Sequence, residues 1–272
     1  RRRRPPARPP RPRCPALGPE AAQVKPFLLI STRPEDSIAE EELDTFLRFT
    51  GLEPDQLRQL RLEKGPEVAR ELQDLDLDEI SGIFVGGSPF TTSTPQAEKT
   101  EVQVRVEKDL GELLDRVMDR GTPFFGACYG VGTLGVHQGG VVDGTYAEGV
   151  GPIRITVTDE GSRDVLLEGM PETFWGYVGH QEAVRALPSN AVLLATGEEC
   201  PVQMFRIGER AWATQFHPEL DDTALLSRID AYKHHGYFRP EDAEEVRRRV
   251  IDGPQADQPR RLLARFAEVF AR

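Results

Sequence analysis

The segment from Pro123 to Gly130 places one cysteine, Cys128, between a short apolar stretch and a run of small residues. Small neighbours allow the backbone to turn sharply from a strand into a helix, whose first amides then point at the thiol. Such surroundings favour the thiolate, which is the nucleophilic form of cysteine. The segment therefore predicts an exposed nucleophile at Cys128.

A base and its orienting group follow about ninety residues later, where the chain reads Gln-Phe-His-Pro-Glu from Gln215 to Glu219. The proline favours an extended backbone at His217, so that the imidazole and the Glu219 carboxylate fall on the same side of the chain. A cysteine on a sharp turn, a histidine base and a carboxylate are the requirements of nucleophilic acyl transfer. The sequence predicts that Cys128, His217 and Glu219 form a catalytic triad.

Over roughly residues 25–220 the chain resembles the class I glutamine amidotransferases, and within them the glutaminase domain or subunit of GMP synthase. The stretch from Gly82 to Ser88 resembles the family's strand and glycine turn, whose amides form the oxyanion hole. The resemblance implies that the amides of Gly87 and Tyr129 are the oxyanion donors.

The same resemblance implies four substrate-binding positions, Gly86, Gly132, Gly179 and His180. The segment 177–184 is similar to the family segment that holds the backbone of glutamine. The family usually has glutamine four residues after the nucleophile, and this chain departs from it with Gly132. Gly179 replaces a family serine, which removes a hydroxyl but leaves the backbone contacts.

The activity that the resemblance implies is hydrolysis of the side-chain amide of L-glutamine to glutamate and ammonia, through a thioester on Cys128. No cofactor and no metal are implied. The chain has no Ser-Gly-Gly-x-Asp-Ser loop, so the ammonia is expected to pass to a separate synthetase. Two alternatives remain open: a γ-glutamyl amine or peptide hydrolase, with a larger leaving group in room left by Gly132, and an inactive regulatory or binding homologue.

The composition argues against nucleic acids and membranes as partners. The net charge is −11 and the pI is near 5.1, which argues against a surface for nucleic acid or anionic membranes. No apolar run approaches the 18 or so residues of a membrane span. Three cysteines at unrelated spacings suggest no disulfide framework, so a cytoplasmic protein is expected. Nothing in the sequence fixes the oligomeric state.

The first 24 residues differ in composition from everything that follows. Residues 1–13 hold seven Arg and five Pro, with no apolar periodicity and no apolar core of a secretory signal. We expect a disordered tail over residues 1–24, either a basic arm or sequence upstream of the ordered protein.

The apolar patterns predict an α/β fold with a mostly parallel, doubly wound sheet and flanking helices, flavodoxin-like as in class I glutamine amidotransferases, with a smaller β-rich portion. Parallel sheets place their sites at the carboxyl ends of strands, where the Gly87 turn, Cys128 and His217 are each expected. The β-rich pattern runs over residues 139–212. The expected strands are 27–30, 57–62, 80–85 and 123–126. The expected helices are 40–49, 100–120 and 129–137.

Two charged regions are interpreted as solvated. The acidic run from Glu35 to Asp44 predicts an exposed helix face, and residues 221–272 predict a helical extension of two or three surface helices after the catalytic domain, 25–220. The adjacent pair His234 and His235 would diverge on a helix, so no metal site is expected there. Cys14 and Cys200 lack the companions of Cys128 and are interpreted as ordinary small residues.

Overall fold

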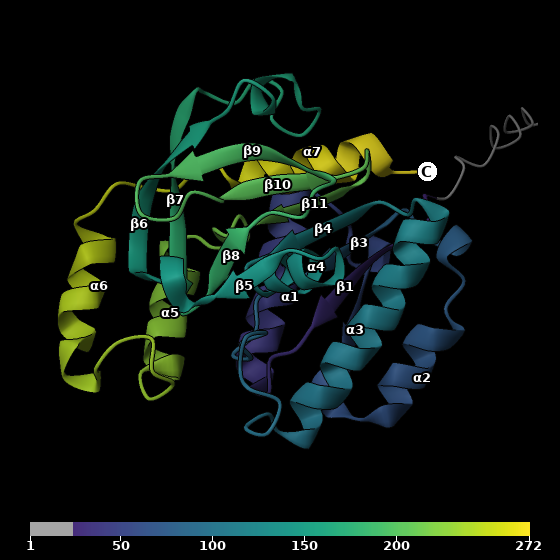
Figure 1. The fold of residues 1–272 in the computed structure, drawn as a ribbon, viewed down its shortest axis with the longest axis horizontal. Coiled ribbons are helices and arrows are strands. Elements are labelled where there is room, and N and C mark those ends of the chain that lie inside the picture. The colour runs from purple at the N-terminus through teal and green to yellow at the C-terminus, as the bar shows by residue number, and fades with distance from the viewer. Residues whose placement is uncertain (1–23) are drawn as a thin grey trace, which may run out of the picture.

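The computed structural model describes residues 24–272, so most of the predicted tail, with Cys14, lies outside the described residues. Within that part, nine strands form one mixed sheet in the order β2-β1-β3-β4-β11-β10-β9-β6-β7 (Figure 1). The strands are β1 (Phe27–Ser31), β2 (Leu57–Arg61), β3 (Gly82–Val85), β4 (Phe124–Ala127), β6 (Glu148–Val157), β7 (Thr173–His180), β9 (Ala191–Gly197), β10 (Met204–Ile207) and β11 (Ala211–Thr214); β5 (Val141–Asp143) and β8 (Ala183–Ala186) pair separately.

The helices are α1 (Asp36–Thr50), α2 (Pro66–Asp74), α3 (Glu101–Arg120), α4 (Tyr129–His137), α5 (Asp222–Tyr232), α6 (Ala243–Ile251) and α7 (Arg260–Phe270). The predicted fold class is confirmed: the first five strands of the sheet order are parallel and the remaining four pair antiparallel. The predicted helix 129–137 agrees with α4, and α3 begins after its capping residue, Thr100. The sequence interpretation missed α2, whose first residue is the helix-compatible Pro66.

The two faces of the parallel strands are covered by different helices. Alternate residues of β1 separate into two cores: Leu28 and Ile30 pack with α2, α3 and α4, whereas Phe27 and Leu29 pack with α1 and α7. This separation follows from the two-residue period of a strand, and both faces are buried as a doubly wound sheet requires. A third cluster joins α5 and α6 to β6 and β7.

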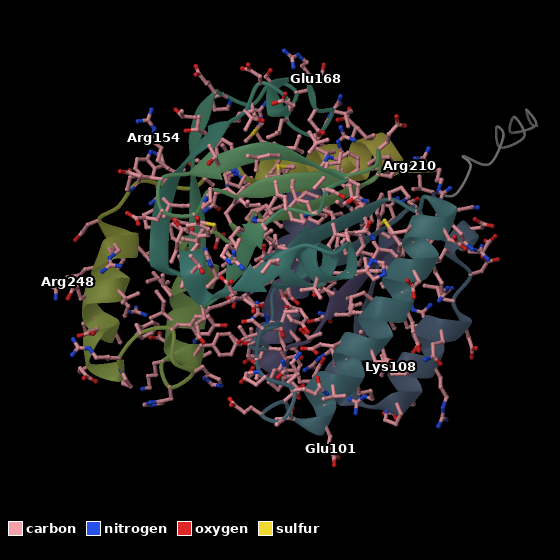
Figure 2. The ribbon with its side chains drawn as sticks, in the orientation of Figure 1. Glu101, Lys108, Arg154, Glu168, Arg210 and Arg248 are labelled. Carbon is pink, nitrogen blue, oxygen red and sulfur yellow. The ribbon has the colours of Figure 1, made fainter. Side chains whose placement is uncertain are left out.

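The prediction of surface helices at the C-terminal end is wrong for α7. Its Leu262, Leu263 and Phe266 are fully buried, and Phe266 packs against Phe84 at a ring-centroid distance of 4.9 Å. The apolar spacing that marked this helix is therefore a core face. Charged side chains outside the cores, such as Lys108, Arg154 and Arg248, project outward (Figure 2). Among the described helices none is long and apolar enough to cross a membrane.

The order of the strands brings distant segments to one edge. β4 lies between β3 and β11, with Val85 opposite Gly126 and Thr214 opposite Ala127 in parallel register. Residues that follow these three strands therefore emerge side by side at the carboxyl edge of the sheet. The Cys128 amide donates to the Thr214 carbonyl across 2.7 Å, which fixes the end of β4 to the end of β11.

Candidate active site

Cys128 occupies the turn between β4 and α4 in a strained conformation. Its φ of 51° and ψ of −88° make it the one residue other than glycine with a positive φ in the described part of the chain. Strain of this kind persists only where the surroundings enforce it, and it is concentrated at functional sites. A Cβ on Gly126 would lie 2.8 Å from the Cα of Gly130, so the sharp turn depends on small residues on both sides of the thiol.

His217 and Glu219 lie beside that turn. The His217 Nδ1 is 2.6 Å from the Glu219 Oε1, and the backbone N–H of His217 donates to the Tyr177 carbonyl at 2.8 Å. His217 is 8% exposed, Glu219 is fully buried, and His217 and Cys128 line the same pocket. The structure thus brings the three residues of the predicted triad together, with the carboxylate on the far side of the imidazole from solvent.

The opposite charges of His217 and Glu219 stabilise one another. Burial alone would lower the pKa of His217, but the neighbouring Glu219 and Cys128 raise it to about 9. Burial opposes ionisation of Glu219 as well, and His217 with Arg228 lowers the pKa of that carboxyl to about 2. At neutral pH the histidine is therefore an imidazolium ready to donate a proton, paired with an ionised carboxylate.

The predicted oxyanion donors, Gly87 and Tyr129, lie beside His217 and Cys128 respectively. Tyr129 opens α4, so its N–H has no acceptor four residues earlier within the helix. A Cβ on Gly87 would lie 2.9 Å from the His217 Cε1 and 2.6 Å from the Arg33 Nη2, so only glycine fits this close to the imidazole. Gly86 does not line either pocket beside Cys128; a Cβ there would meet the Glu42 carboxylate at 2.5 Å.

The triad carboxylate belongs to a group of four buried charged side chains, Arg33, Glu42, Glu219 and Arg228. The Glu42 carboxylate accepts from the Ser31 hydroxyl at 2.6 Å and from the Arg33 Nε at 3.3 Å. The Arg228 guanidinium lies 3.6 Å from Glu219 and 3.8 Å from Glu42. All four charged side chains are at most 5% exposed. The prediction that the acidic run from residue 35 to 44 is wholly solvated is therefore wrong at Glu42, which binds inward to two arginines.

Arg228 is expected to matter more for stability than a surface arginine. Replacing Arg228 by methionine leaves Glu42 and Glu219 with less compensating charge, which costs about 3 kcal/mol of unfolding free energy. Thermal unfolding should show a Tm lower by several degrees. Arg247→Met on neighbouring α6 is the matched control, because its ion pair to Asp230 is partly exposed and contributes at most about 1 kcal/mol. Equal losses in the two variants would refute the assigned role.

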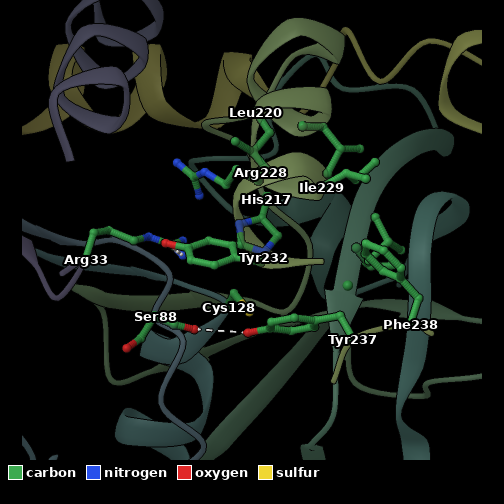
Figure 3. A pocket seen from close by; sticks show the side chains of 14 residues that line it. Arg33, Ser88, Cys128, His217, Leu220, Arg228, Ile229, Tyr232, Tyr237 and Phe238 are labelled. Atoms are coloured by element: carbon green, nitrogen blue, oxygen red, sulfur yellow. Dashed lines mark hydrogen bonds between the residues drawn. The ribbon is translucent and has the colours of Figure 1, made fainter. Parts of the chain in front are cut away.

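Two pockets meet at Cys128, and they differ in character. We call them the polar pocket and the apolar pocket; they share Ser88, Cys128, Gly179 and Tyr237. The polar pocket is further lined by Phe90, Thr91, Tyr129, Gly132, Val142, His180, Gln181, Glu182, Ala183 and Gln215. The apolar pocket is further lined by Arg33, Val150, Val178, His217, Leu220, Leu225, Arg228, Ile229, Tyr232 and Phe238 (Figure 3). Three of the four predicted substrate-binding residues, Gly132, Gly179 and His180, line the polar pocket.

The absence of a side chain at Gly132 does not leave open space. A Cβ there would lie 2.6 Å from the Thr92 Oγ1 and 3.2 Å from the Glu182 Oε1. Glu182 is held by the N–H groups of Thr92 and Ser93, each at 2.6 Å. The expectation of extra room at this position is therefore wrong, because these side chains fill the place next to the helix.

Gly132→Ala is expected to lower kcat/KM for a γ-glutamyl substrate about tenfold, since the new methyl group must displace Thr92 at the pocket wall. The double variant Thr92→Ala, Gly132→Ala should recover most of the loss, because it removes the hydroxyl that the methyl meets. Steady-state kinetics on both proteins test this. Gly111→Ala on α3 is the control, since a Cβ there meets nothing within 4 Å. An unchanged kcat/KM in Gly132→Ala would show that Thr92 does not define the wall.

A second group of cysteine, histidine and glutamate lies close by. One ligand atom each from Glu148, His180 and Cys200 lies within 4.8 Å of the others. His180 is held between the Glu148 carboxylate and the Glu182 carbonyl, both at 2.9 Å. Burial raises the pKa of Cys200 to about 12, so its thiol stays protonated and is a poor nucleophile. Of these three residues only His180 lines the polar pocket, and its hydrogen bonds to Glu148 and Glu182 hold its imidazole in that wall.

Several residues of the site carried no clear signal in the sequence. Arg33 follows β1 at the same edge as Gly87, and this position after a strand was the available clue. Arg228 and Tyr232 belong to α5, and Tyr237 and Phe238 come from the segment after it. Tyr237 donates to the Ser88 carbonyl at 3.4 Å, as Figure 3 shows. The charged sequence of the C-terminal region does not indicate that this region covers Cys128, which lies far earlier in the chain.

Comparison with known proteins agrees with this geometry. The family model described as glutamine amidotransferase class-I matches residues 57–229. A glutamine-hydrolyzing GMP synthase of Porphyromonas gingivalis is 32% identical over 160 residues, 57% of this chain but 28% of that protein. The chain therefore spans less than a third of that relative. One of the subunits of a glutamine-hydrolyzing GMP synthase of Thermoplasma volcanium is 27% identical over 64% of this chain and 79% of its own length.

Solved structures share the fold. A glutamine amidotransferase from Thermotoga maritima superposes with a TM-score of 0.66 at 20% identity, covering 90% of this chain and 96% of its own. One from Methylobacillus flagellatus gives a TM-score of 0.62 at 15% identity, covering 91% and 94%. At these identities the likeness establishes the shared fold, and it extends over about nine tenths of the chain.

Proposed function

Because the chain belongs to the class I glutamine amidotransferase family, we propose that it hydrolyses γ-glutamyl amides, with L-glutamine as the simplest substrate, through a thioester on Cys128. The observation that carries the proposal is the contact between the His217 Nδ1 and the Glu219 Oε1 at 2.6 Å, beside a strained cysteine in the same pocket. That arrangement supplies a nucleophile, an acid and a group that orients the acid.

The reaction begins when the Cys128 thiolate attacks the γ-carbonyl carbon of a donor whose glutamyl group lies in the polar pocket. The amides of Gly87 and Tyr129 then hold the oxyanion of the tetrahedral intermediate. His217 gives its proton to the leaving nitrogen, the carbon–nitrogen bond breaks, and the glutamyl thioester remains on the sulfur. The neutral imidazole next takes a proton from water, which attacks the thioester and releases glutamate.

Ammonia from glutamine is proposed to reach a separate synthetase, as the likeness to the GMP synthase subunit of Thermoplasma volcanium suggests. A cytoplasmic location remains a prediction from the cysteine content. The third hypothesis, an inactive regulatory homologue, is disfavoured by the complete Cys128, His217 and Glu219 group, which a protein without catalysis has no need to hold in this form.

The test is an assay of the purified chain with L-glutamine, in which glutamate and ammonia are measured separately and hydroxylamine is added to intercept the thioester. We expect equal amounts of the two products, and γ-glutamyl hydroxamate when hydroxylamine is present. No hydrolysis of glutamine or of a chromogenic γ-glutamyl anilide, with or without a candidate synthetase, would contradict the proposal.

A further inference from the structure

The position of His217 indicates which of the two pockets receives the leaving group. His217 lines the apolar pocket and not the polar pocket, whereas Gly132, His180 and Glu182 line the polar pocket alone. The acid that protonates a leaving nitrogen must lie within hydrogen-bonding reach of it. With the glutamyl group in the polar pocket, the leaving group must therefore enter the apolar pocket.

The apolar pocket is larger than ammonia requires. Its cavity volume is about 50 Å³, whereas one molecule of the size of water or ammonia needs roughly 10–15 Å³ on the same measure. Six side chains without polar atoms line it, beside Tyr232 and Tyr237: Val150, Val178, Leu220, Leu225, Ile229 and Phe238. A wall of this kind gains free energy only when it buries apolar surface of a ligand.

Two cations of the pocket have unused hydrogen-bonding capacity: no guanidinium nitrogen of Arg228 has a hydrogen-bond partner among the described residues, and Arg33 has one free nitrogen, which lies closer to the reacting centre. The Arg33 Nε pairs with Glu42, and its Nη1 donates to the Tyr232 hydroxyl at 3.3 Å, but its Nη2 contacts no acceptor among the described residues. Arg33 is 3% exposed, and Figure 3 shows it extending toward Tyr232 on the wall of the pocket. A Cβ on Gly87 would lie 2.6 Å from this nitrogen, so the free N–H groups are next to the reacting centre.

The Arg33 guanidinium is protonated and carries a positive charge. Burial by itself would lower the pKa of Arg33, but Tyr232 and the Glu42 carboxylate raise it well above its usual range. A buried guanidinium with free N–H groups favours a carboxylate and disfavours a second cation. Polyamine leaving groups are therefore disfavoured, and an amine that carries a carboxylate is favoured.

We propose that the apolar pocket binds an α-amino acid with an apolar or aromatic side chain as the leaving group, so that γ-glutamyl dipeptides ending in such residues are donors. This inference rests on the proposed function of the triad. The Cys128 thiolate displaces the amino acid from the γ-carbonyl carbon, and His217 gives its proton to the departing nitrogen. Water then cleaves the thioester, so γ-glutamyl-phenylalanine and one water yield glutamate and phenylalanine.

The first experiment compares three donors on the unmodified chain: L-glutamine, γ-glutamyl-phenethylamide and γ-glutamyl-phenylalanine. We expect kcat/KM to rise at least tenfold from glutamine to the phenethylamide and at least severalfold more to the dipeptide, which adds the carboxylate. If glutamine is hydrolysed and neither larger donor is, the inference fails and the proposed function stands. If none of the three is cleaved, the proposed function fails.

The second experiment uses two variants of the pocket. Phe238→Ala removes apolar wall from a partly exposed side chain, and should lower kcat/KM for γ-glutamyl-phenylalanine about tenfold relative to that for glutamine. Ile229→Phe fills the pocket and should lower the same ratio. Trp175→Ala is the control, because this partly exposed aromatic residue lines neither pocket. An unchanged ratio in both pocket variants would place the leaving group elsewhere and overturn the inference.

Discussion

Cys128→Ala is expected to abolish hydrolysis of every γ-glutamyl donor, with a loss of about 10⁶-fold, because removing the nucleophile leaves only substrate binding and the oxyanion amides. The fold should persist, since the alanine side chain is smaller and the strained turn depends on its small neighbours, Gly126 and Gly130. Release of glutamate measures the activity, and circular dichroism with the Tm checks the fold.

Cys200→Ala is the matched control for that variant. Cys200 is fully buried and burial raises its pKa to about 12, so it is not available as a thiolate. The control should retain nearly full activity even if it unfolds at a lower temperature. A glutamine analogue that alkylates thiols should modify Cys128 once per chain and leave Cys200 unmodified. Modification of Cys200, or an active Cys128→Ala protein, would refute the assigned nucleophile.

His217→Asn is expected to have the second-largest effect, a loss of roughly 10⁴-fold, because it removes the group proposed to protonate the leaving nitrogen. Glu219→Gln should cost roughly 10²-fold, since the imidazole remains but loses the carboxylate that orients and charges it. Measured kcat/KM values give the order. A greater loss in Glu219→Gln than in His217→Asn would reverse the roles proposed for the two residues.

The pH profile separates these roles further. The pKa of His217 is raised to about 9, so the imidazolium that donates the proton is present below that pH and is lost as the pH rises through it. We expect kcat/KM to fall on the alkaline side near pH 9. In Glu219→Gln the fall should move to lower pH, because Glu219 is the largest contributor that raises this pKa. Glu209→Gln, an exposed substitution, should leave the profile unchanged.

The same shifts give opposite dependences of stability on pH. His217 is charged more readily in the folded state, so its contribution is complete below its unfolded pKa, about 6.5, and is lost as pH rises through about 9. Glu219 has a lowered pKa, so its contribution is present above its ordinary value and is lost as pH falls towards about 2. Both contributions are therefore complete between about pH 5 and 6.5.

Local sequence determined the nucleophile turn and the base with its carboxylate. Small residues around Cys128 permit one sharp turn from strand to helix, and a proline between His217 and Glu219 sets the two side chains on one side of the chain. These are effects of neighbouring residues, so they were predictable without knowledge of the fold. The parallel α/β architecture was predictable too, because apolar strands alternate with amphipathic helices.

What lies around the triad was decided by tertiary packing. Glu42 belongs to an acidic run and Arg228 to a charged tail, and each is buried only because α1 and α5 meet behind Glu219. Tyr237 and Phe238 line the same pocket as Cys128, although more than 100 residues of sequence separate them from it. Contacts between segments so far apart depend on the strand order and on helix packing, which local pattern does not encode. The chemistry of the reacting bond could therefore be predicted from the sequence, whereas the pocket that selects the leaving group follows from how the C-terminal helices fold back over the sheet edge.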